Sequence, residues 1–130
     1  MARSAGIKLV LTGFLLAAVF VSTGVRARGP TPEDAPMTMS VAELPRQGAE
    51  TYRLIFQGGP FPYEKDGTVF GNRERMLPAH KRGYYREYTV ATLGARNRGT
   101  RRIVCGGPPK TPEACYYTAD HYASFRRIVP

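Results

Sequence analysis

The chain has 130 residues and a basic composition, with 19 Lys and Arg against 10 Asp and Glu and a formal net charge of +9. This length accommodates one small domain and not several. The excess positive charge favours a polyanionic partner, such as a nucleic acid or an anionic surface. The two cysteines have no neighbouring histidines, which excludes a closed zinc site built on them.

Residues 1–27 have the layout of a secretory signal peptide. Arg3 and Lys8 precede an apolar run over residues 9–25, and Val25 and Ala27 are small residues at the positions that signal peptidase requires. We expect cleavage after Ala27. The alternative is a retained membrane anchor, for which the apolar run falls short of the ~20 residues that a spanning helix needs.

Cleavage would leave 16 Lys and Arg against 10 Asp and Glu, a net charge of +6. Residues 28–39 are rich in proline and small side chains and predict a flexible leader. The folded domain is therefore expected to span residues 40–130. In an exported chain, Cys105 and Cys115 are expected to form a disulfide that staples the loop between them.

One helix and several short strands are predicted within the domain. Pro45 suits a first helical turn and Gly58 a helix stop, and Tyr52, Ile55 and Phe56 have the spacing of a core-facing stripe. Runs of aromatic and β-branched residues predict strands at 68–70, 84–91, 100–105, 116–118 and 122–129. The expected fold class is α+β, with one N-terminal helix packed on a twisted antiparallel sheet.

The stretch 84–102 combines a predicted strand with a cluster of arginines at positions 96, 98, 101 and 102. Side chains alternate across a strand, so Glu87 lies on the face opposite Tyr88 and Val90. If Tyr88, Val90 and Ile103 pack against the helix, Glu87 and Arg102 come together on the open face.

Glu87 with Arg98 and Arg102 can be interpreted as a structural ion pair, which is common on sheet faces. A phosphodiester site is the other interpretation, because His121 adds a group that can donate a proton near neutral pH. Metal-free cleavage of RNA needs a base for the 2′-OH, an acid for the departing 5′-oxygen and cations for the phosphate. The sequence offers no cluster of metal ligands, so we expect neither a metal nor another cofactor. His80 is interpreted as a surface residue.

An ordered series of motifs runs from about Ala42 to Ile128. It comprises Phe61-Pro-Tyr63, Asp66-Gly67, Phe70, Asn72-Arg-Glu74, Tyr84-Tyr85, Glu87-Tyr-Thr-Val90, Gly94-Ala-Arg96, Arg98-Gly-Thr-Arg-Arg102, Tyr116-Tyr-Thr118 and Asp120-His-Tyr122. This series resembles the secreted bacterial guanyl-specific ribonucleases, the family of barnase and of the small actinobacterial enzymes. The resemblance implies the microbial ribonuclease fold and cleavage of single-stranded RNA 3′ to guanosine through a 2′,3′-cyclic phosphate.

The resemblance also implies roles for the catalytic residues. Glu87 matches the general base of the family and His121 its general acid. Arg98 and Arg102 match the arginines that hold the scissile phosphate, and Tyr122 matches a residue near that phosphate.

Base recognition is implied for the loop after the predicted strand 68–70. Asn72, Arg73 and Glu74 match the recognition loop, in which a carboxylate accepts hydrogen bonds from guanine N1–H and the exocyclic amine. Phe70 and Arg73 would flank the base.

The sequence departs from the actinobacterial relatives in two places. Those enzymes tie the chain ends with a disulfide, whereas Cys105 and Cys115 bracket an enlarged loop shortly before His121. Gly71 stands where those relatives often carry a bulkier polar residue, which predicts a more mobile recognition loop.

We therefore expect a secreted, monomeric, metal-independent endoribonuclease, with no membrane association after signal cleavage. One alternative is a non-catalytic secreted protein that holds RNA or another polyanion on the same basic face. Another is a ribonuclease toxin, for which the producing cell would need a barstar-like intracellular inhibitor.

Overall fold

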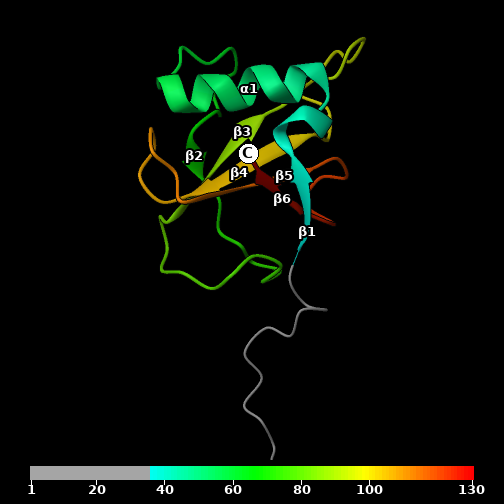
Figure 1. The fold of residues 1–130 in the computed structure, drawn as a ribbon. Coiled ribbons are helices and arrows are strands. Elements are labelled where there is room, and N and C mark those ends of the chain that lie inside the picture. The colour runs from blue at the N-terminus through cyan, green and yellow to red at the C-terminus, as the bar shows by residue number, and fades with distance from the viewer. Residues whose placement is uncertain (1–35) are drawn as a thin grey trace, which may run out of the picture.

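The computed structural model describes residues 36–130 (Figure 1). The expected signal peptide and residues 28–35 of the expected leader lie outside the described residues. The end of that leader needs a correction, because Met37–Ser40 form strand β1 and pair in parallel with strand β6, Arg126–Val129. The sheet thus begins before residue 40. Among residues 36–130, no helix has the length and apolar character needed to span a membrane.

Helix α1 spans Arg46–Gln57, after a short 3-10 helix, η1, at Val41–Glu43. Gly58 ends α1 in the left-handed conformation, with φ 81°, and its N–H donates to the Leu54 and Ile55 carbonyls. The buried face of α1 consists of Gly48, Thr51 and Ile55.

The predicted stripe on this helix was wrong at one position, since Phe56 is 45% exposed. Thr51 sets the rotation of the helix, because its hydroxyl donates to the Thr89 carbonyl in the sheet at 3.0 Å. That bond turns Thr51 and Ile55 toward the sheet and leaves Tyr52 only partly buried at the edge of the core.

Six strands form one sheet in the order β1-β6-β5-β4-β3-β2. The central strands are β3 at Tyr85–Thr89, β4 at Arg102–Gly106 and β5 at Ala114–Thr118, and β2 is the short edge strand Thr68–Val69. All neighbours pair antiparallel except β1 and β6. The prediction of one helix packed on a sheet is confirmed, and the parallel pair at the edge is the feature that the sequence pattern did not indicate.

Helix α1 crosses one face of this sheet, and the loop over residues 70–83 extends from the opposite side (Figure 1). As the strand alternation predicts, Tyr88, Val90 and Ile103 lie in the core beneath α1. A second, smaller cluster forms on the other face from Leu77, Tyr85, Val104, Tyr116 and Phe125. Glu87 shares that second face because it alternates with Tyr88.

The expected disulfide joins Cys105 and Cys115, which face each other directly across β4 and β5 with their Cα atoms 4.1 Å apart. Both cysteines are buried in the core beneath α1. The disulfide thus closes the base of the hairpin loop over residues 107–113, and Lys110 in that loop contacts Gly58 at the end of α1. The enlarged loop therefore lies beside the helix.

Replacing both cysteines with alanine should lower the free energy of unfolding by about 3 kcal/mol, because the short ring no longer restricts the unfolded chain. Urea unfolding monitored by circular dichroism measures this loss. Thr111→Ala, in the exposed loop between the cysteines, is the control and should leave the midpoint unchanged. An unaltered midpoint in the double variant would contradict the stabilising role.

Candidate active site

A pocket of about 750 Å³ opens on the face of the sheet that α1 leaves uncovered. It gathers most of the residues that the sequence nominated, although they come from three separate segments of the chain. These lining residues are Phe70, Asn72, Arg73, Glu74, Glu87, His121 and Tyr122. The disulfide-closed loop contributes nothing to its lining. Within residues 36–130, no three His, Cys, Asp or Glu residues are grouped so that they could hold a metal ion.

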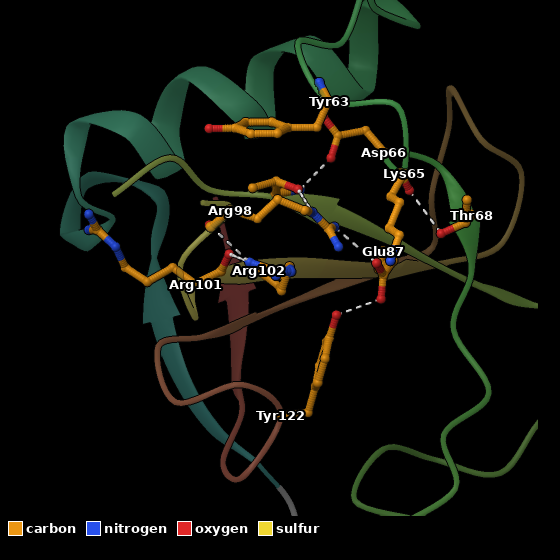
Figure 2. A network of polar contacts seen from close by, with 10 residues as sticks. Tyr63, Lys65, Asp66, Thr68, Glu87, Arg98, Arg101, Arg102 and Tyr122 are labelled. Carbon is orange, nitrogen blue, oxygen red and sulfur yellow. Dashed lines mark hydrogen bonds and ion pairs between the residues drawn. The ribbon is translucent and has the colours of Figure 1, made fainter. Parts of the chain in front are cut away.

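The Glu87 carboxylate is held through both of its oxygens (Figure 2). Arg98 Nη2 lies 3.0 Å from Glu87 Oε1, and the Tyr122 hydroxyl donates to Glu87 Oε2. Arg98 is itself oriented by a hydrogen bond from its Nε to Thr89 Oγ1 at 2.9 Å. The side chains of Glu87 and Arg98 are 14% and 23% exposed, so solvent screens this pair less than a surface salt bridge.

Tyr122 is more closely bound to the carboxylate than the sequence indicated. Burial, followed by the hydrogen bond to Glu87, raises the pKa of Tyr122 to about 12. The phenol therefore stays protonated at neutral pH and acts as a donor to Glu87. Tyr122 also packs against Phe70, with ring centroids 5.0 Å apart, and Phe70 in turn contacts the buried Phe125. Phe125 lines the pocket and was not among the predicted residues.

Arg102 is only 3% exposed. Its Nη1 donates to the carbonyls of Arg101 and Arg98, at 2.8 and 3.3 Å. Its Nε is buried and has no hydrogen-bond partner in the part of the chain that the structure describes. Thr89 faces Arg102 across the strands and Glu87 faces Val104, so Glu87 and Arg102 are diagonal neighbours on one face. A buried cationic donor beside a carboxylate suits an anionic ligand such as a phosphate.

His121 lies at the pocket on a tightly wound loop after β5. Both His121 and Tyr122 have left-handed backbones, with φ 54° and 71°, which is unusual for residues other than glycine. Asp120 holds this turn, because its carboxylate accepts hydrogen bonds from the backbone N–H and hydroxyl of Ser124 and from the Thr118 hydroxyl. The bonds from Ser124, followed by the one from Thr118, lower the pKa of Asp120.

The His121 N–H donates to the Thr100 carbonyl at 3.0 Å, which ties the turn to the segment before β4. The imidazole remains exposed. Sequence reasoning missed Asp120 and Ser124 as the residues that fix the turn. The signal was present in the run from Thr118 to Ser124, where short polar side chains can bond neighbouring backbone groups.

Asn72 shapes the predicted recognition loop from within. Its side-chain Nδ2 donates to the Leu77 carbonyl at 2.9 Å, and its Oδ1 accepts from the Leu77 N–H at 3.1 Å. The Asn72 side chain is thus bonded within the loop, while Arg73 and Glu74 are exposed at the pocket. Gly71 does not have a positive φ, and a Cβ there would meet Arg73 Cγ at an ordinary 3.6 Å. The backbone at position 71 therefore does not require glycine.

Asp66 supports the site from the loop before β2, on the edge of β3 opposite β4. Its carboxylate accepts the Thr89 N–H at 2.7 Å and the Tyr63 N–H at 3.2 Å. Since Thr89 orients Arg98, Asp66 links the loop before β2 to the ion pair at Glu87 (Figure 2). The sequence pattern gave no sign of this contact.

The fold and the site together define a protein of the microbial ribonuclease class. A family model described as ribonuclease matches residues 27–129, and the chain belongs to this family. It is 50% identical over 95 residues to guanyl-specific ribonuclease Sa of Kitasatospora aureofaciens, covering 73% of this chain and 96% of that protein. The resemblance to the guanyl-specific ribonucleases is thereby confirmed.

Other relatives agree with this assignment. Guanyl-specific ribonuclease Sa3 of Kitasatospora aureofaciens is 59% identical over 85 residues, which cover 65% of this chain and 58% of Sa3. The chain therefore spans somewhat more than half the length of Sa3. A crystal structure of ribonuclease Sa2 with guanosine-2′-cyclophosphate is similar with a TM-score of 0.67 and 46% identity, over 74% of this chain and 98% of that one.

Replacing Asp66 with alanine should destabilise the fold by about 2 kcal/mol, because two backbone N–H groups lose their acceptor. Thermal or urea unfolding measures the loss. Glu64→Ala is the matched control, since Glu64 is an exposed acid in the same loop. Equal stability of the two variants would show that the Asp66 contacts contribute nothing.

Proposed function

We propose that this protein is a secreted guanyl-specific endoribonuclease that cleaves single-stranded RNA on the 3′ side of guanosine. The observation that carries the proposal is the Glu87 carboxylate, held between Arg98 and Tyr122 in the same pocket as His121 and Glu74. The names of the relatives Sa, Sa3 and St as guanyl-specific ribonucleases support it. So do the structures of Sa2 with guanosine-2′-cyclophosphate and with 3′-GMP.

The first chemical step forms a cyclic phosphate. Glu87 accepts the proton of the 2′-OH, and the 2′-oxygen forms a bond to phosphorus. His121 protonates the 5′-oxygen as the bond between phosphorus and that oxygen breaks. The positive charges of Arg98 and Arg102 stabilise the charge that accumulates on the non-bridging oxygens.

The second step hydrolyses the 2′,3′-cyclic phosphate with the two roles exchanged. His121 now accepts a proton from water, which attacks phosphorus, and Glu87 returns a proton to the departing 2′-oxygen. The product is a 3′-phosphate. Tyr122 is a positioning residue in both steps, because its hydroxyl fixes one carboxylate oxygen of Glu87 and leaves the orientation of that carboxylate defined.

Guanine preference rests on Glu74 in the recognition loop. Guanine alone among the RNA bases presents two adjacent donors, N1–H and the exocyclic amine, beside the O6 acceptor. The Glu74 carboxylate can accept from both donors, while backbone N–H groups of the loop can donate to O6. Phe70 and Arg73, which line the same pocket, would flank the ring.

Secretion is supported by the signal-peptide pattern of residues 1–27 and by the disulfide between Cys105 and Cys115. The exported protein would act as a monomer. A partner that blocks the site inside the producing cell would need acidic groups to match Arg73, Arg98 and Arg102. An alternative in which the basic face only holds RNA predicts binding without cleavage.

Glu87→Gln and His121→Gln should each lower the turnover of the dinucleoside phosphate GpU by roughly 10²- to 10⁴-fold, because each removes one proton-transfer group. Activity is measured in excess EDTA, with circular dichroism to show that the variants are folded. Glu50→Gln, an exposed acid on α1, is the control. Near-normal turnover in either active-site variant would overturn the mechanism.

Glu74→Gln should lower kcat/KM for GpU by about 10- to 100-fold, because one charged acceptor for two guanine donors is lost. Cleavage of ApU should change little, since adenine lacks that pair of donors. The measurement is the ratio of kcat/KM for the two substrates. An equal fall for both would show that Glu74 does not read the base.

A further inference from the structure

A second pocket, of about 330 Å³, lies on the other side of the recognition loop. It shares the segment from Val69 to Arg73 with the active-site pocket, and the remainder of its lining is His80, Lys81, Arg82 and Tyr85. No acidic residue lines it. Lys81 and Arg82 are exposed, and neither they nor Arg73 form a salt bridge within residues 36–130. Three cations thus converge on a concave surface without a carboxylate to neutralise them.

One wall of this second pocket is held in place by stacking. The centroids of the His80 and Tyr84 rings are 3.6 Å apart, and the two ring planes meet at an angle of 15°. The Tyr84 hydroxyl donates to Glu113 at 2.7 Å, and the Tyr84 carbonyl accepts the Gly107 N–H at 3.2 Å. Burial, with the Glu113 hydrogen bond next, raises the pKa of Tyr84 to about 12, so the phenol remains a donor at neutral pH.

The enlarged hairpin is therefore connected to the second pocket, although it does not line the active site. Glu113 and Gly107 both belong to the loop that the Cys105–Cys115 disulfide closes. A Cβ on Gly106 would collide with the Tyr84 ring, so the hairpin and Tyr84 fit against each other only with glycine there. The hairpin braces Tyr84, and Tyr84 supports His80.

The position of the second pocket indicates which part of an RNA it meets. In the proposed mechanism His121 protonates the departing 5′-oxygen, so the nucleotide downstream of the cut lies next to His121. His121 lines the active-site pocket and is absent from the second pocket. The recognition loop, with the guanine-reading Glu74, lies between the two. A chain that enters the second pocket must therefore come from the 5′ side of the recognised guanosine.

We infer that Arg73, Lys81 and Arg82 form a subsite for the phosphate on the 5′ side of the recognised guanosine. This inference rests on the proposed function for the direction of the RNA. The guanidiniums and the ammonium donate charge-assisted hydrogen bonds to phosphate oxygens. The protein would accordingly prefer a guanosine inside a chain to one at its 5′ end.

Binding of two nucleotides tests the subsite without relying on turnover. Isothermal titration at fixed ionic strength compares guanosine 3′-phosphate with guanosine 3′,5′-bisphosphate, which differ only in the 5′-phosphate. The native protein should bind the bisphosphate about tenfold more tightly, the ratio expected from one charge-assisted hydrogen bond. In the Lys81→Ala/Arg82→Ala double variant the two dissociation constants should become nearly equal, while that for the 3′-phosphate stays as it was.

Arg46→Ala/Arg53→Ala is the matched control, because it removes the same charge from exposed positions on α1, across the sheet from both pockets. It should keep the tenfold ratio. Equal affinities in the native protein, or a ratio that survives in the Lys81/Arg82 variant, would overturn the inference. Failure of the proposed function would be seen separately, as an inability of the native protein to cleave GpU.

Discussion

The arrangement of the site depends on one constraint, the fixing of the Glu87 carboxylate by Arg98 on one oxygen and Tyr122 on the other. A base that must take a proton from a hydroxyl is effective only when its orientation is defined before the substrate arrives. Both partners follow Glu87 in the sequence, but they belong to two separate segments of the chain. Arg98 belongs to the loop before β4, and Tyr122 to the turn after β5. Fixing Glu87 therefore requires the sheet to be complete.

That constraint extends into the fold through Thr89. Its hydroxyl orients Arg98, its N–H is held by Asp66, and its carbonyl accepts the Thr51 hydroxyl from α1. The helix, the loop before β2 and the ion pair thus meet at one residue of β3. Stability and activity are coupled at this point, because any shift of α1 against the sheet moves the group that orients Arg98. The disulfide lies in the same helix-side core and fixes the neighbouring hairpin.

Much of this could be predicted from sequence because short-range rules govern it. Alternation along β3 separated Glu87 from Tyr88 and Val90, and proline and glycine marked the ends of α1. The sequence could not give the rotation of α1, which depends on the Thr51 hydrogen bond to a residue far along the chain, so Phe56 was misplaced. Strand β1 was missed because its partner β6 lies at the other end of the domain. The contacts of Asp66 and Tyr122 were missed for related reasons, since side-chain hydrogen bonds between distant residues leave no period in a sequence.

The most direct test of the account is to incubate the purified protein with a long single-stranded RNA in excess EDTA and to sequence the new ends. If Glu87 and His121 act as acid and base beside a guanine-reading loop, cuts will follow guanosine almost exclusively. Early products will carry 2′,3′-cyclic phosphates that convert slowly to 3′-phosphates. Intact RNA with protein bound, or cuts distributed over all four bases, would contradict the account.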